Sequence, residues 1–220
     1  MQMRRLDRWP RAGCAFILGA VTGLSACGAP RYTYSADYTD NTYFKVPYGW
    51  HQLTPAQIAT GLHGAPPAGV WTAAFDAGKT ASSEDLESFL ATSPVVLAEV
   101  FKVKASVTAG LSYNGLEDSF LPVTPAARQA ISGSSLSNFK LLNRQMLTPG
   151  QGVHGVQVMF QYTDEIVPGL NVADTFGLVA LTNDIDTQVY LLFVHCTSSC
   201  YSQDQKAIDD VMTSFTVRSP

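Results

Sequence analysis

Charged residues are scarce in this chain, and beyond the first 26 residues its basic residues do not cluster. Of 220 residues, 14 are Lys or Arg and 18 are Asp or Glu, which leaves a formal net charge of −4 at pH 7. Binding to nucleic acid depends on Lys and Arg side chains that neutralise phosphates, and adhesion to anionic lipid depends on similar basic clusters. We therefore expect no nucleic acid as a partner and no electrostatic attachment to a membrane surface.

The motifs of common enzymes and metal sites are also missing or incomplete. Residues 73–80 approach a P-loop, but Ala73 stands where the first glycine belongs, and Ser137–Lys140 matches S-x-x-K but enters a predicted strand instead of a helix. No H-E-x-x-H or G-x-S-x-G sequence occurs. The four histidines lie apart and are expected at the surface or in turns: His51, His63, His154 and His195. We predict no catalytic residue, no metal site and no cofactor.

What the chain does have is an export signal at its start. Four arginines precede an uncharged apolar run over residues 12–24, which is too short to remain as a membrane-spanning helix. The run ends in Leu24–Ser25–Ala26–Cys27, which resembles the lipobox of bacterial prolipoproteins. The resemblance implies that residues 1–26 are removed and that Cys27 is acylated as the new N-terminus.

Lipidation of Cys27 predicts a protein held by its acyl chains on the extracytoplasmic face of the cell membrane. The alternative is an ordinary secretory peptide cleaved elsewhere, with Cys27 incidental. Cys14 leaves with the leader, so Cys196 and Cys200 remain and are expected to pair in a disulfide in an oxidising compartment. The alternative for this pair is a metal site completed by His195.

Residues 27–42 follow the leader and lack apolar periodicity, so we expect a tether there and a single domain over residues 43–220. The tyrosines of this stretch, Tyr32, Tyr34 and Tyr38, suit either contact with the membrane interface or an edge strand on the domain.

Helices are expected after Thr54, over residues 82–92 and 124–131, and from Ser202 onward; strands are expected over residues 43–46, 69–75 and 95–103. Two hairpins follow, formed by residues 139–147 with 153–162 and by 174–181 with 188–196. Residues 189–194 are apolar without alternation, so their strand should be covered on both faces. The elements predict an α+β fold in which helices sandwich an antiparallel sheet.

The chain resembles the PsbP-like superfamily in the segment Tyr43–Trp50, in the two hairpins and in the ending over residues 208–217. Within that superfamily it resembles in style the actinobacterial LpqN-type envelope lipoproteins. The resemblance implies an antiparallel sheet between helices and a binding, adaptor or assembly role without catalysis. The Cys196/Cys200 pair and residues 110–123 depart from the family pattern, which leaves any shared binding face open.

Three functions follow from the sequence. The first is a non-catalytic, lipid-anchored binding or adaptor protein that serves another envelope protein. The second is a carrier of an apolar small molecule held between the sheet and the closing helix, for which residues 189–194 offer apolar surface. A hydrolase has the least support.

Overall fold

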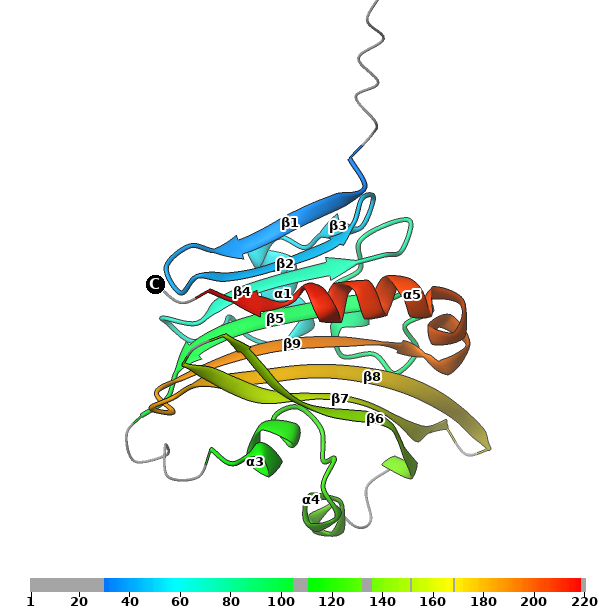
Figure 1. Cartoon of the computed structure of the whole chain (residues 1–220). Coiled ribbons are helices and arrows are strands. Elements are labelled where there is room, and N and C mark those ends of the chain that lie inside the picture. Colours follow the sequence, from blue (N-terminus) through cyan, green and yellow to red (C-terminus); the bar gives the residue numbers. More distant parts are fainter. Residues whose placement is uncertain (1–29, 105–110, 132–135, 151, 168, 219–220) are drawn as a thin grey trace, which may run out of the picture.

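The computed structural model describes residues 30–104, 111–131, 136–150, 152–167 and 169–218. Seven antiparallel strands form the main sheet in the order β3-β4-β5-β9-β8-β7-β6 (Figure 1). Their bounds are β3 (His51–Gln52), β4 (Trp71–Asp76), β5 (Val95–Lys102), β6 (Leu136–Gly150), β7 (Val153–Val167), β8 (Leu170–Asn183) and β9 (Gln188–Thr197). A smaller antiparallel sheet contains β1 (Tyr32–Asp37), β2 (Thr42–Pro47) and β10 (Thr216–Val217).

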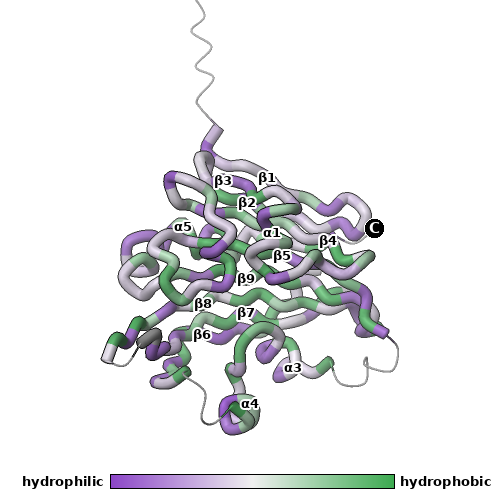
Figure 2. Tube along the Cα trace, turned by 180° about the vertical axis from the view of Figure 1, so that it is seen from behind, coloured by the Kyte–Doolittle hydropathy of each residue, from purple (hydrophilic) through white to green (hydrophobic). Residues whose placement is uncertain are grey.

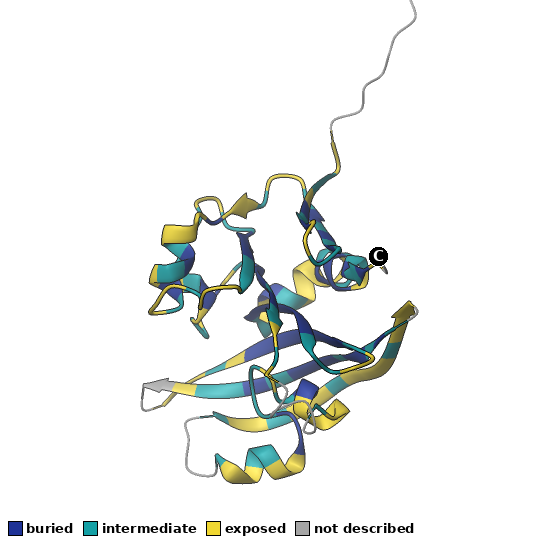
Figure 3. Ribbon diagram, turned by 90° about the vertical axis from the view of Figure 1, so that its left-hand side faces the viewer, coloured by how far each residue is buried: buried dark blue, intermediate teal, exposed yellow. Residues whose placement is uncertain are grey.

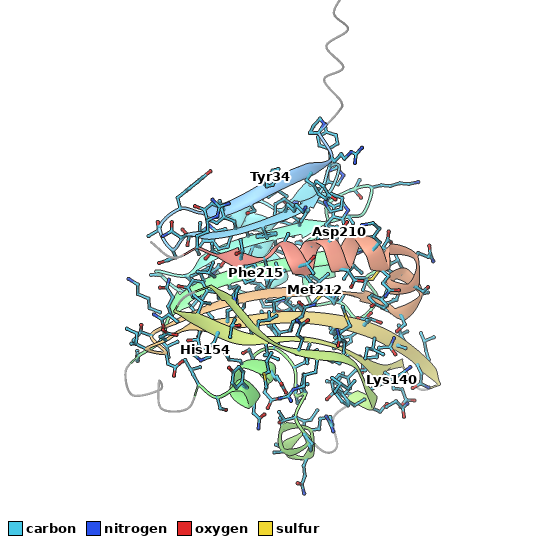
Figure 4. All side chains as sticks on the ribbon, in the orientation of Figure 1. Tyr34, Lys140, His154, Asp210, Met212 and Phe215 are labelled. Atoms are coloured by element: carbon cyan, nitrogen blue, oxygen red, sulfur yellow. A yellow bond between two sulfur atoms is a disulfide. The ribbon has the colours of Figure 1, made fainter. Side chains whose placement is uncertain are left out.

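One face of the main sheet is covered by helix α5 (Ser198–Ser214) together with the smaller sheet. Ile208, Val211 and Met212 recur at helical spacing on α5 and are buried, as an apolar stripe on an amphipathic helix should be. Met212 and, just beyond the helix, Phe215 lie between α5 and the strands (Figure 4). Phe44 of β2 packs on the same core, so this face is filled by side chains from both elements.

The opposite face lies under shorter elements. These are α1 (Pro55–Gly61), the single 3-10 turn η1 (Glu84–Leu86), α3 (Tyr113–Glu117) and α4 (Pro125–Ala130). Their apolar side chains and the facing strand residues form a second core. The central strands are therefore buried while the outer elements are exposed (Figure 3), and hydrophobic residues concentrate along the central strands (Figure 2).

The predicted α+β fold with an antiparallel sheet is confirmed, and so is the double coverage of strand β9. Leu191 and Phe193 belong to one core, whereas Leu192 and Val194 belong to the other, because successive side chains of a strand point to opposite faces. Both predicted hairpins form, and α1 begins with the expected capping box between Thr54 and Gln57. None of the helices in the described ranges is long and apolar enough to cross a bilayer.

Three predicted segments differ from the structure. Tyr32–Asp37, expected within a tether, forms β1 and pairs with β2, so the edge-strand alternative holds for these residues. Helix α5 begins at Ser198 and not at Ser202, because the Thr197 side chain accepts a hydrogen bond from the backbone N–H of Cys200 and caps the helix earlier.

Residues 82–92 form only the short turn η1 instead of a helix. The buried carboxylate of Asp76 accepts hydrogen bonds from the backbone N–H of Ser82, at 2.8 Å, and of Gly78, at 2.7 Å. The Ser88 hydroxyl accepts another from the N–H of Leu90. Side-chain acceptors of this kind offer the backbone an alternative to helical hydrogen bonds, and here they hold the segment as a loop over the sheet.

Candidate ligand-binding site

A cavity of about 340 Å³ lies on the face of the main sheet opposite α5. The sheet supplies its floor through side chains of β5, β8 and β9, and the rims come from α1, the η1 segment and the loop after α3. The lining residues are Leu62, Leu86, Glu87, Ser88, Phe89, Leu97, Phe120, Leu121, Asp174, Phe176, Phe193 and His195. The volume and the mostly apolar lining fall within the range of small-molecule sites in proteins.

Aromatic rings form much of the floor of the cavity. Phe176 and Phe193 stack with ring centroids 5.8 Å apart, and the imidazole of His195 continues the row at 5.9 Å from Phe176 and 5.5 Å from Phe193. Phe120 stacks on Phe193 from the rim at 4.5 Å, and Phe89 meets Phe176 edge-on at 5.5 Å. These rings present flat apolar surface suited to stacking with another ring.

Two polar side chains, Asp174 and His195, interrupt this apolar surface. Phe176 of β8 pairs with His195 of β9, and Asp174 lies two residues before Phe176, so Asp174 and His195 are diagonal neighbours on the same face of the sheet. The side chain of Asp174 is 0% exposed and that of His195 is 4% exposed. His195 Nδ1 lies 3.7 Å from Asp174 Oδ2, and His195 Nε2 lies 3.2 Å from the carbonyl oxygen of Leu86.

The surroundings fix which nitrogen of His195 carries a proton. A carbonyl oxygen can only accept a hydrogen bond, so Nε2 must be the donor to Leu86, and Nδ1 is left facing the carboxyl group of Asp174. Burial raises the pKa of Asp174 above its ordinary value, and nearby Asp164 adds to this, while His195 opposes it. The floor of the cavity therefore contains a buried carboxyl group beside the imidazole nitrogen that does not contact Leu86.

The mouth of the cavity is more polar than its floor. Glu87 lines the cavity and its Oε2 lies 3.3 Å from His63 Nε2, and both side chains are well exposed. The charge of Glu87 is therefore screened by solvent and does not reach the apolar interior with full strength.

Two of the three cysteines for which the sequence predicts a role lie within the described residues. Cys196 and Cys200 are joined in a disulfide and both are buried. His195 and Cys196 point to opposite faces of the sheet, because the first lines the cavity while the second belongs to the α5 core. They do not converge on one metal, and no group of metal-ligating side chains is found among the described residues. Cys27 lies outside the described residues.

The two incomplete enzyme motifs do not form sites either. In the segment that approaches a P-loop, the backbone N–H of Gly78 donates to the carboxylate of Asp76 and that of Ala77 donates to the carbonyl oxygen of Pro94, so neither is free to bind phosphate. Ser137 and Lys140 lie in strand β6, where Ser137 donates a hydrogen bond to the carbonyl oxygen of Thr163.

Sequence reasoning missed the polar pair and predicted the wrong place for His195, which is buried instead of at the surface. A signal was available: the predicted hairpin places Asp174 at the start of one strand and His195 at the end of its partner, so the two had to be neighbours across the strands. No such signal existed for the rim residues Leu86, Phe89 and Phe120, because they reach the cavity through loops whose path depends on tertiary contacts.

Comparison with known proteins adds little to this description. No protein-family model matches the chain, and no curated protein does. Among solved structures, it is similar to the Ran-binding protein Mog1p of Saccharomyces cerevisiae, at 10% identity and a TM-score of 0.47 over 84% of this chain and 95% of that one.

Two further matches are a PsbP protein and LpqN, the two kinds of protein that the sequence resembles. Cyanobacterial PsbP from Synechocystis sp. PCC 6803 shares 15% identity, with a TM-score of 0.46 over 91% of this chain and 99% of that one. LpqN of Mycobacterium tuberculosis, a protein involved in cell envelope biogenesis, shares 10% identity, with a TM-score of 0.43 over 86% of this chain and 93% of that one. At these identities and TM-scores, the likeness supports no inference about the function of this chain.

Proposed function

We propose that this protein is a non-catalytic binding protein of the cell envelope that holds a small apolar molecule in the cavity above Asp174 and His195. The observation on which the proposal rests is the cavity itself, with a volume of about 340 Å³, a floor of stacked rings and one buried polar pair. Small-molecule sites combine mostly apolar walls with a few polar groups that orient the ligand.

The hydrogen bonds of the polar pair support a binding role over a hydrolytic one. In a Ser-His-Asp arrangement the imidazole nitrogen remote from the aspartate must accept the proton of the nucleophile. Here that nitrogen is Nε2, and it donates to the carbonyl oxygen of Leu86. Ser88, which also lines the cavity, accepts a hydrogen bond from the N–H of Leu90 and has no base beside it in the contacts of the described chain.

The location of the ligand differs from the one that the sequence suggested. The sequence placed an apolar ligand between the sheet and the closing helix α5, but that face is filled by Met212, Phe215 and the side chains of the smaller sheet. The cavity lies on the other face, under loops instead of under a long helix. Loops can move aside at lower cost than a packed helix, which favours this face for ligand entry.

The lipobox residues support a position on the outer face of the membrane, with acylated Cys27 as the attachment. An adaptor role toward another envelope protein is a second candidate, and exposed aromatic residues favour it. Tyr34, Tyr38 and Tyr48 are 77%, 81% and 64% exposed in and beside the β1–β2 hairpin, and Tyr34 stands out on the surface of β1 (Figure 4). Tyrosine is enriched in protein interfaces.

The binding function can be tested with N-phenylnaphthylamine, a neutral dye that fluoresces in apolar sites. We expect saturable fluorescence with the full-length protein and its loss in Ser88→Trp, because the indole would fill the cavity from its rim. Gln205→Trp, on the exposed surface of α5, is the matched control and should bind as the unaltered protein does. Dye binding that survives Ser88→Trp would refute the assignment of this cavity.

A further inference from the structure

The carboxyl group of Asp174 has hydrogen-bonding capacity that the described residues do not use. Its side chain is fully buried and lines the cavity, yet neither oxygen has a hydrogen-bond partner within the described chain. The nearest polar atom, His195 Nδ1, also has no partner and lies beyond hydrogen-bond distance at 3.7 Å. Buried polar groups in proteins are almost always paired, so a carboxyl group in a cavity without a partner among the described residues is suited to a donor that a ligand supplies.

The polar pair carries no excess charge when it holds one proton besides the one on Nε2. With Nε2 protonated toward Leu86, a neutral imidazole would turn the lone pair of Nδ1 toward an ionised carboxylate, which is unfavourable in an apolar cavity. One further proton, on Nδ1 or on the carboxyl group, removes this repulsion. In the first case the pair is an imidazolium with a carboxylate and in the second both groups are neutral, so the sum of charges is zero in each.

Apart from Asp174, His195 and Glu87, none of the described residues that line the cavity is charged. Asp85 and Asp164 lie near the pair but do not line the cavity, and Glu87 is well exposed, so solvent screens its charge. A ligand with a net charge would leave that charge uncompensated among the phenylalanine rings, which costs much more than burying a neutral group.

We propose that the ligand is a neutral, flat, largely apolar molecule with one hydrogen-bond donor, a hydroxyl or an N–H, that binds the carboxyl group of Asp174. The apolar body lies on the row of rings formed by Phe176, Phe193 and His195. This inference rests on the proposed binding function and adds to it the polarity, the charge and the orientation of the ligand.

Four probes with the same ring and one differing substituent test the inference. They are naphthol, with a neutral donor; methylnaphthalene, without a donor; naphthoate, an anion; and naphthylmethylammonium, a cation, all substituted at the same ring position. Their affinities for the full-length protein are measured by displacement of N-phenylnaphthylamine. We expect naphthol to bind about tenfold more tightly than methylnaphthalene, the ratio typical of one hydrogen bond to a buried carboxyl group, and both charged probes to bind more weakly than naphthol.

Variants at position 174 test whether the carboxyl group of Asp174 accepts the hydrogen bond from naphthol. In Asp174→Leu, which replaces the carboxyl group by an apolar side chain of similar size, naphthol and methylnaphthalene should bind equally. Asp204→Leu, at an exposed position of α5, is the control and should keep the tenfold preference. The order of affinities of the four probes is measured on the unaltered protein and so does not require any variant to fold. Asp174→Asn, which keeps the shape of the side chain, is a second variant and should reduce the preference for naphthol over methylnaphthalene.

Each outcome decides between the two proposals. If methylnaphthalene binds as tightly as naphthol, or if a charged probe binds most tightly, the inferred ligand class is wrong while the binding function stands. A tenfold preference that persists in Asp174→Leu would show that another group accepts the hydrogen bond. If neither the dye nor any of the four probes binds, the binding function itself fails.

Discussion

Asp174 and Gly155 each lie in an environment that is unusual for their residue type. Asp174 is a carboxyl group with no exposed surface, at the start of the buried part of β8. Gly155 lies near the start of β7, paired with Leu181 of β8, where most residues would present a side chain. Both are explained by close neighbours on an adjacent strand, and both yield predictions that a single substitution can check.

The pH dependence of stability should report the burial of Asp174. Burial raises the pKa of this carboxyl group in the folded state above its unfolded value of about 3.9. Between the two values the folded chain therefore binds more protons than the unfolded chain, so the contribution of Asp174 to stability is complete below about pH 3.9 and is lost as pH rises through the folded pKa.

Urea unfolding of the unaltered protein and of Asp174→Asn from about pH 4 to about pH 6 measures this contribution. We expect the free energy of unfolding of the unaltered protein to fall relative to that of the variant as pH rises. Asp204→Asn, at an exposed position on α5, is the control and relieves no burial cost. Parallel curves for the unaltered protein and Asp174→Asn would contradict the assigned environment.

Gly155→Ala should destabilise the sheet. A Cβ atom at this position would overlap the carbonyl oxygen of Ala180 and lie 2.7 Å from the Cα of Leu181, so the backbone of β8 would have to move. We expect a loss of about 2 kcal/mol in the free energy of unfolding, the cost of overpacking a rigid interior. Gly64→Ala, where nothing lies within 4 Å, is the control and should change stability little; equal values for the two variants would be evidence against this packing.

At the scale of elements, local side-chain hydrogen bonds decide where helices form. The Thr197 hydroxyl extends α5 toward β9 by one turn beyond the predicted start, whereas Asp76 prevents a helix over residues 82–92. Both results concern the ends of elements, where a few polar contacts outweigh the apolar periodicity used for prediction. The early start of α5 also brings Cys200 opposite Cys196, so that the disulfide ties the end of β9 to the first turn of α5.

Loss of this disulfide should lower stability by a moderate amount. The sequence separation of its cysteines is only 4, so it restricts a short loop of the unfolded chain, and the chain-entropy relation gives about 2 kcal/mol. Urea unfolding of Cys196→Ala/Cys200→Ala measures the loss, and reductant should lower the stability of the unaltered protein but not of the double variant. A double variant as stable as the unaltered protein would show that the bond adds nothing.

The whole molecule has two unequal faces. On one, α5 and the smaller sheet pack against the main sheet with a filled core. On the other, short elements and loops leave a cavity over the ring-lined floor. The proposed ligand site lies on the second face, so the longest helix of the described chain does not contribute to it.

The proposed membrane attachment is tested on the whole protein. In cells given labelled palmitate, we expect label in the unaltered chain and none in Cys27→Ser, because only a thiol at this position can form the thioether to lipid. The variant should appear in the medium or remain unprocessed. Cys14→Ser, within the leader, is the matched control and should stay labelled. An unlabelled native chain would remove the basis for the anchor.

Much of the architecture follows from the sequence alone. The apolar run over residues 189–194 predicts a strand covered on both faces, and the capping box at Thr54 predicts the start of α1, because both patterns depend only on neighbouring residues. The two late hairpins follow from alternation and turn residues for the same reason.

Only the tertiary structure decided which face of the sheet holds a cavity and which residues line it. The cavity joins Phe89 and Phe120, from two separate loops, to Asp174 and His195 on neighbouring strands, and no local pattern encodes how those loops lie over the sheet. The orientation of His195 likewise depends on its contact with the carbonyl oxygen of Leu86, which is distant in sequence. Local patterns determine the elements, whereas the chemistry of the site arises from contacts between residues that only folding brings together.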